Sequence, residues 1–193
     1  ELHSFKNRCF KWGYFTKVHN IEVEVKRMFP RQISSTLTFM WCSRYLTWKH
    51  PELPIWMAAR LKAKGYKFIL DMYGSGVMFE RALQLANELR VNDVVNFCGN
   101  VPNELILSAM KEHDIFLFTS DRNEGWGAVA NEAMSNGCVL VASQAIGSVP
   151  FLVKDGDTGV TFRSSCVNKG FGRFGNTIDN KALDSLCEKV EWL

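Results

Sequence analysis

The chain has 193 residues, of which 47% are hydrophobic and 22% are charged, and its formal net charge is +3. This composition excludes a disordered tail, and the length suffices for one α/β domain with a buried core. The mild positive charge permits an anionic ligand but does not demand a nucleic-acid or membrane partner. The six cysteines form no C-x-x-C pair, which argues against zinc-ribbon and thioredoxin-like sites.

Residues 1–36 show no regular hydrophobic period, and they interleave basic and aromatic side chains such as Lys6, Phe10 and Trp12. Such a mixture suits a surface for single-stranded nucleic acid, or a linker whose aromatics dock on a neighbouring domain. We favour a linker or a remnant of an N-terminal domain, because no RNA-binding motif accompanies the basic residues. We therefore expect the regular domain over residues 37–193 and no nucleic-acid partner.

From residue 37 onward, apolar strands alternate with helices. The pattern predicts strands at 37–42, 67–73, 94–98, 114–118 and 138–142, with a short last strand at 159–162. Helices are predicted at 51–64, from just after 76 to about 89, and at 102–111, 127–136 and 178–193, and residues 164–178 are expected to form a loop. Strands that are apolar on both faces indicate a parallel sheet covered by helices on both sides. We therefore expect an α/β fold with a Rossmann-like, doubly wound parallel sheet.

Sheets of this kind bind ligands at the carboxyl ends of their strands, so the turns after the strands are the candidate sites. Arg44 and Lys49 follow the first strand, and two cations in one loop are suited to hold a diphosphate. Gly74 and Ser75 begin a turn after the second strand, where the backbone can approach a ligand or simply turn tightly. Phe79 stands where a dinucleotide fingerprint needs its third glycine, so that fingerprint is excluded.

The segment after the fourth strand, residues 119–132, carries Glu124 and Glu132 and has two glycines around Trp126. The predicted helix begins near Gly127, and the unpaired N–H groups at a helix start attract an anion such as a phosphate. Glu124 and Glu132 beside such an anion are costly unless each meets a hydroxyl or a cation, and a sugar and a ribose supply hydroxyls. Spacing alone equally allows Glu124 to be a helix-capping acid and Glu132 to be an exposed helix acid.

Over residues 37–162 the chain resembles the C-terminal domain of the family 4 retaining glycosyltransferases, which have the GT-B fold. The hallmark is E-G-W-G-A-V-A-N-E-A-M at 124–134, which keeps the family's E-x7-E spacing. The segment S-R-Y-L-T-W-K-H at 43–50 matches the family's G-R-L-x-x-x-K-G. The segments V-N-F-C-G-N-V-P at 95–102 and G-S-V-P-F-L-V-K-D-G-D-T-G at 147–159 match two further family segments. Four positions depart from the pattern, since glycines are replaced by Ser43, His50 and Ser148 and an acid is replaced by Phe151.

The resemblance implies that the intact protein transfers a sugar from a nucleotide diphosphate sugar to an acceptor hydroxyl and keeps the anomeric configuration. It assigns Arg44 and Lys49 to the diphosphate, Glu124 to the catalytic position at the donor sugar, and Glu132 to the ribose hydroxyls. The other substrate-binding positions that we expect are Gly74, Ser75, Val101, Trp126, Gly127 and Ala128. No metal or other cofactor is expected, because cations and a helix dipole can take its place.

The resemblance also implies a setting for the reaction. The wording of the motifs is similar to that of bacterial members that build capsular polysaccharides or exopolysaccharides, in the cytoplasm or at the inner face of the membrane. The acceptor, a sugar or a lipid-linked glycan, would be held by an N-terminal domain that this chain has no room for. We therefore expect the chain alone to bind nucleotide and to transfer little or no sugar.

Two other classes stay open at this point. A non-catalytic nucleotide-binding or assembly module fits the same donor site without a second domain. A sugar epimerase of the GT-B fold would share the architecture, although its hallmark histidine and acids do not stand in matching positions.

Overall fold

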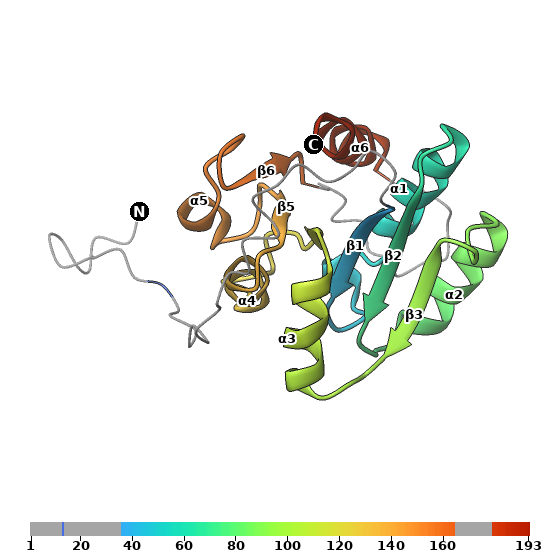
Figure 1. The fold of residues 1–193 in the computed structure, drawn as a ribbon, viewed down its shortest axis with the longest axis horizontal. Coiled ribbons are helices and arrows are strands. Elements are labelled where there is room, and N and C mark those ends of the chain that lie inside the picture. The colour runs from blue at the N-terminus through green and yellow to red at the C-terminus, as the bar shows by residue number, and fades with distance from the viewer. Residues whose placement is uncertain (1–12, 14–35, 165–178) are drawn as a thin grey trace, which may run out of the picture.

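The predicted strands form one parallel sheet, which Figure 1 shows between its helices. The computed structural model describes residues 13, 36–164 and 179–193 of the chain. Within these residues the strand order is β3-β2-β1-β4-β5-β6, and every pairing is parallel. The strands are β1 (Leu37–Cys42), β2 (Phe68–Tyr73), β3 (Val95–Gly99), β4 (Ile115–Phe118), β5 (Val139–Ser143) and β6 (Gly159–Phe162). This is the Rossmann strand order, so the predicted doubly wound fold class is confirmed.

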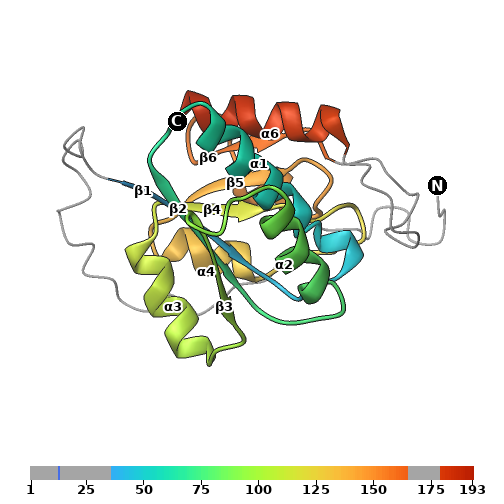
Figure 2. The same ribbon diagram turned by 90° about the vertical axis from the view of Figure 1, so that its right-hand side faces the viewer.

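Helices cover both faces of the sheet (Figure 2). Their bounds are α1 (Glu52–Ala63), α2 (Phe79–Glu88), α3 (Asn103–Glu112), α4 (Val129–Ser135), α5 (Val149–Leu152) and α6 (Asn180–Trp192), with a short 3-10 helix η3 (Thr47–Lys49) before α1. The first face carries α1, α2 and α6, and the second face carries α3 and α4. Such crossovers on both sides make the strand order reverse between β1 and β4, which places a crevice at the carboxyl ends of these two strands.

The central strands are buried on both faces, and β1 shows why its sequence is apolar throughout. Phe39 and Trp41 point into the core beneath α1, α2 and α6. Met40, between them, points into the opposite core with Phe116 and Leu140. All five side chains are at most 1% exposed. A strand in this position has no solvent face, so its sequence reads as a continuous apolar run rather than as an alternation.

Two elements differ from the sequence-based prediction. Residues 147–150, for which the sequence analysis predicts no helix, lead into the short helix α5, because Pro150 lies in the first helical turn, where its missing N–H costs nothing. Helix α4 begins at Val129 rather than at Gly127, because Gly127 has a left-handed φ of 71° that no α-helix contains. The expected linker at 1–36 and the expected loop at 164–178 fall almost wholly outside the described residues.

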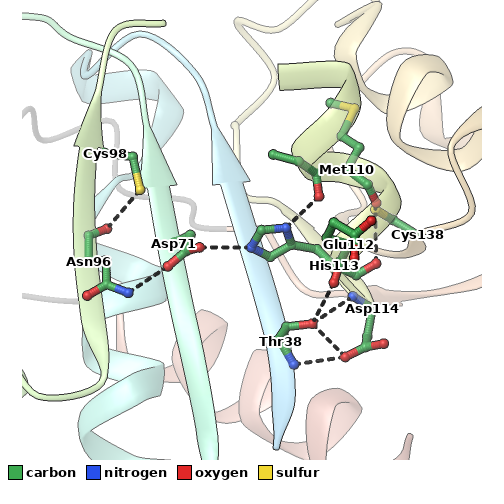
Figure 3. A network of polar contacts seen from close by, with 10 residues as sticks. Thr38, Asp71, Asn96, Cys98, Met110, Glu112, His113, Asp114 and Cys138 are labelled. Atoms are coloured by element: carbon green, nitrogen blue, oxygen red, sulfur yellow. Dashed lines mark hydrogen bonds and ion pairs between the residues drawn. The ribbon is translucent and has the colours of Figure 1, made fainter. Parts of the chain in front are cut away.

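A polar network joins α3 to the sheet (Figure 3), and the sequence analysis does not predict it. His113 follows the last residue of α3, and its Nδ1 lies 2.7 Å from the carbonyl oxygen of Ala109. Its Nε2 lies 3.1 Å from Oδ2 of Asp71 in β2, and the Nδ2 of Asn96 in β3 donates to Oδ1 of the same carboxylate at 2.8 Å. Both ring nitrogens of His113 therefore face acceptors, and only the imidazolium can donate to both.

The pKa values of this pair follow from the geometry. Burial opposes the charged form of His113, but its hydrogen bonds to Asp71 and to the Ala109 carbonyl outweigh burial and raise its pKa above the ordinary value. The hydrogen bond from His113 holds the pKa of Asp71 below its ordinary value. His113 lies where α3 gives way to β4, and its ring reaches Asp71 in the middle of β2. Of the helices in the described part of the chain, none is both long enough and apolar enough to cross a membrane.

Candidate functional site

The loops that follow the strands pack against one another at the carboxyl edge of the sheet. The Tyr45 N–H, after β1, donates to the Ser75 carbonyl at 2.9 Å. The Asp121 N–H, after β4, donates to the Trp48 carbonyl at 2.9 Å, and the Gly147 N–H, after β5, donates to the Glu124 carbonyl at 3.3 Å. The loops after β1 and β2, after β1 and β4, and after β4 and β5 are thus neighbours in space.

Two glycines in these turns are required by contacts between loops. Gly74 has a φ of 119°, and a Cβ on it would lie 1.9 Å from the carbonyl oxygen of Ser43. A Cβ on Gly147 would lie 2.0 Å from the carbonyl oxygen of Gly125. No side chain fits at either distance, so loop packing is sufficient to explain both glycines. The G-S-G turn after β2 therefore closes tightly on the β1 loop, and it also borders the cavity described next.

A cavity of about 230 Å³ opens between the loops after β1, β2 and β3 and the helices α3 and α4. Five of the sequence-predicted site residues line it, namely Arg44, Gly74, Ser75, Val101 and Glu132. Its remaining polar lining includes Ser43, Asn100 and Asn103, which the sequence analysis did not identify. Asn100 directly follows β3, so the rule that ligands bind after strands would have indicated it.

Arg44 and Glu132 give the cavity one cation and one anion that are both available to a ligand. Arg44 is exposed, and within the described part of the chain its guanidinium makes no hydrogen bond or ion pair. The half-buried carboxylate of Glu132 likewise meets no donor among the described side chains, and burial raises its pKa. Burial and the charge of Glu132 together raise the pKa of the Cys42 thiol to about 12, so this cavity-lining cysteine stays protonated.

The two other charged residues predicted for the site meet each other, and neither is among the residues that line the cavity. Lys49 ends η3, and its ammonium forms an ion pair with Oε2 of Glu124 in the loop after β4. The two side chains are only 12% and 13% exposed, and Ser120 Oγ donates to the same carboxylate oxygen at 3.2 Å. The structure thus separates the two predicted diphosphate cations. Arg44 lines the cavity, whereas Lys49 is engaged by Glu124.

The remaining predicted positions lie on the turn that starts α4, beyond the cavity lining. Ala128 is the N-cap residue of α4 and directly follows Gly127. The Trp126 Nε1–H donates to Oδ1 of Asn131 at 2.8 Å, and the Trp126 ring lies 5.7 Å from the exposed ring of Phe151 between centroids. The indole of Trp126 is therefore oriented by the following helix, α4, and by α5.

His50, which directly follows Lys49, is buried, with a side chain that lies between two carboxylates. Its Nδ1 lies 2.8 Å from Oε1 of Glu52, and its Nε2 lies 3.4 Å from Oδ2 of Asp121 without hydrogen-bond geometry. Burial opposes the charged form, but the hydrogen bond to Glu52 and the charges of Glu52 and Asp121 outweigh it and raise the pKa of His50. No sequence motif predicts this cluster of His50, Glu52 and Asp121. Among the described residues, no group of three or more His, Cys, Asp or Glu side chains is placed to hold a metal ion.

Comparison with known proteins identifies the family. The model of the family described as "Glycosyl transferases group 1" matches residues 28–169, which is well over half of the chain. The chain belongs to this family. The matched region contains every predicted site residue, from Arg44 to Glu132.

Curated relatives from bacteria match part of this region. The D-inositol 3-phosphate glycosyltransferase of Corynebacterium aurimucosum is 40% identical over 80 residues, which are 42% of this chain and 18% of the relative. The N-acetyl-alpha-D-glucosaminyl L-malate synthase of Bacillus anthracis is 36% identical over 90 residues, 47% of this chain and 23% of the relative. The chain thus matches about a fifth of the length of these relatives.

Solved glycosyltransferase structures share the fold. S. aureus TarM, solved with UDP, superposes with a TM-score of 0.69 at 18% identity, over 92% of this chain and 31% of TarM. The pneumococcal O-GlcNAc transferase GtfA, solved with UDP and GlcNAc, superposes with a TM-score of 0.67 at 17% identity, over 80% of this chain and 28% of GtfA. The expectation that the chain folds as the C-terminal portion of a GT-B enzyme is confirmed.

Proposed function

We propose that this chain is the donor-binding part of a retaining glycosyltransferase, which moves a sugar from a nucleotide diphosphate sugar to an acceptor hydroxyl. One observation carries the proposal. A cavity at the strand ends presents the exposed guanidinium of Arg44 and the half-buried carboxylate of Glu132. The mostly buried Lys49–Glu124 ion pair joins the loop after β1 to the loop after β4 at the same edge of the sheet. A nucleotide sugar offers an anion for the first group and hydroxyls for the second.

The chemistry that these residues support is stabilisation of the leaving group. When the bond between the sugar and the phosphate breaks, negative charge collects on the diphosphate oxygens. Arg44 can bind such oxygens with its planar fork, and Lys49 brings a second positive charge at the end of η3. The Glu124 carboxylate, which holds Lys49 in place, then lies on the side where the donor sugar is expected.

The nucleoside end of the donor is assigned to the other side of the cavity. Glu132 would accept hydrogen bonds from the ribose hydroxyls, which compensates the cost of a half-buried carboxylate. Val101 and its neighbours after β3 would lie against the base. We propose uridine as the base, because related folds have been solved with UDP. Protein cations carry out the charge neutralisation in this scheme, so no metal is required.

The wider setting is also a proposal, since the chain matches only about a fifth of its curated relatives. We propose that an N-terminal domain supplies the acceptor, a sugar or lipid-linked glycan, and that the chain alone binds donor but transfers little sugar. We place the whole protein in bacterial capsular polysaccharide or exopolysaccharide synthesis, in the cytoplasm or peripherally at the inner face of the membrane. Robust turnover by the purified chain would contradict the need for a second domain.

Donor binding by the purified chain tests the central proposal. Thermal shift with UDP, GDP and ADP sugars identifies the base, and calorimetry then gives the affinity of the preferred donor. Arg44→Ala is expected to weaken binding by about 1.5–3 kcal/mol, the usual cost of a lost charged contact. Lys67→Ala is the matched control, because Lys67 is an exposed cation at the amino end of β2. No binding of any nucleotide sugar, or equal losses in the two variants, would overturn the proposal.

A further inference from the structure

The residue that follows Lys49 has an unusual backbone. His50 has φ 50° and ψ 56°, the left-handed conformation, while its side chain is buried. For a residue other than glycine this conformation is strained, and it persists only where surrounding contacts hold it. The contacts that hold His50 therefore also determine where the preceding residue, Lys49, places its ammonium.

Those contacts come from two different elements. Glu52 lies in the first turn of α1, and Asp121 lies in the loop after β4 that also carries Glu124. One nitrogen of the imidazole ring faces each carboxylate, so the ring bridges α1 and the β4 loop. In the described part of the chain, these two carboxylates are the titratable groups whose charges act on His50.

The backbone that leads into His50 is joined to the same β4 loop. The Thr119 Oγ1 lies 2.7 Å from the Lys49 carbonyl oxygen, to which it donates, and it accepts from the Trp41 Nε1–H at 2.9 Å. One residue earlier, the Trp48 carbonyl accepts from the Asp121 N–H at 2.9 Å. The position of the Lys49 turn relative to Glu124 therefore depends on these hydrogen bonds to the loop after β4.

We infer that His50 is a positioning residue whose imidazolium ties the Lys49 turn to the loop after β4, so that affinity for the donor diphosphate falls when His50 loses its proton. The inference rests on the proposed function. Loss of the proton removes the cation that faces the carboxylates of Glu52 and Asp121, while the Lys49 ammonium stays paired with Glu124. A more negative field then opposes an incoming anion, and Glu52 and Asp121 lose the cation that separates them.

The pH window follows from the local environment of the ring. Because Glu52 and Asp121 raise the pKa of His50 above its ordinary value of about 6.5, the proton is lost on the alkaline side of that value. Donor affinity is therefore expected to be full below about pH 6.5 and to decline as the pH rises through the His50 pKa.

Calorimetric titration of a UDP-sugar into the chain at several values between about pH 6 and about pH 8.5 tests the inference. A UDP-sugar is used because the terminal phosphate of free UDP itself titrates near pH 6. The wild-type affinity is expected to fall by about threefold to tenfold across this range, the effect of one charge close to a partly buried anion site. His50→Asn, which tolerates the left-handed backbone but carries no charge, is expected to bind more weakly and without this slope.

His113→Gln is the control, because His113 is a second histidine with a raised pKa but is not among the residues that line the cavity. This variant should keep the wild-type slope. If His50→Asn fails to fold, His50→Gly replaces it, because glycine adopts the left-handed backbone freely. A flat wild-type profile, or an unchanged slope in the His50 variants, overturns the inference while donor binding itself upholds the proposed function. Absence of UDP-sugar binding at every pH instead overturns both.

Discussion

Replacing Lys49 with methionine tests the buried ion pair and its proposed role in one variant. The methionine keeps the apolar stem but leaves the Glu124 carboxylate, only 13% exposed, without its cation. Removing one partner of a fully buried ion pair costs about 3–5 kcal/mol. Here the remaining solvent contact and the Ser120 hydrogen bond at 3.2 Å reduce the expected loss to about 2–3 kcal/mol. For a domain of this size, that loss corresponds to a melting temperature lower by about 4–12 °C.

The double variant Lys49→Met with Glu124→Gln separates stability from binding. The neutral glutamine no longer needs a cation, so most of the lost stability should return, with a coupling energy of about 1–3 kcal/mol in a double-mutant cycle by urea unfolding. Binding of a UDP-sugar, measured by calorimetry, should stay weak in the single and double variants alike, because both lack the lysine charge. Two results would refute the reasoning. A single variant as stable as the wild type shows that the pair is not buried, and unchanged donor affinity removes Lys49 from the site.

Three further predictions concern neighbouring features. Gly127→Ala should lower the free energy of unfolding by about 2–4 kcal/mol in a denaturant titration, because its φ is 71° and its Cβ would lie 2.3 Å from the Phe118 ring. Gly125→Ala in the same motif is the control. Its Cβ meets no atom within 4 Å, so this variant should be nearly neutral. The raised pKa of His113 contributes stability that is fully present below about pH 6.5 and is lost as the pH rises through that pKa. His113→Gln should therefore flatten the pH dependence of the free energy of unfolding in this range. An unchanged pH profile would contradict the pairing of His113 with Asp71. Glu132→Gln should weaken UDP-sugar binding. It should not lower the melting temperature, because burial already disfavours the charged carboxylate. Equal donor affinity in the variant and the wild type would exclude Glu132 from the site.

The fold was accessible from the sequence because its central strands have no solvent face. The runs at 37–42 and 114–118 are apolar on both sides of the pleat, and such runs separated by helices have few other arrangements. The strand-end rule then placed Arg44 and Glu132 at one edge, where both line a single cavity. These predictions needed only local pattern and the topology that it implies.

The partnerships within the site were not accessible in the same way. Lys49 and Glu124 are 75 positions apart, and each is a common surface residue type whose burial depends on the packing of two loops. His113 pairs with Asp71 across 42 positions, and no period in the sequence links them. Helix α5 was missed because a glycine, a serine and a proline within four positions, 147–150, are typical of a turn, while here the proline occupies the first helical turn.

The close backbone contacts between the loops have a consequence for attempts to change donor preference. A Cβ on Gly74 or Gly147 would lie 2.0 Å or less from a carbonyl oxygen. Nearly every substitution at these two positions should therefore unfold the domain rather than change which donor it binds. A combinatorial library that randomises these positions would consist mostly of unfolded members. Diversity is better placed at Ser43 and Asn103, whose side chains border the same cavity. The backbone of the loops then stays unchanged, and selectivity for the donor is varied through the residues that line the cavity.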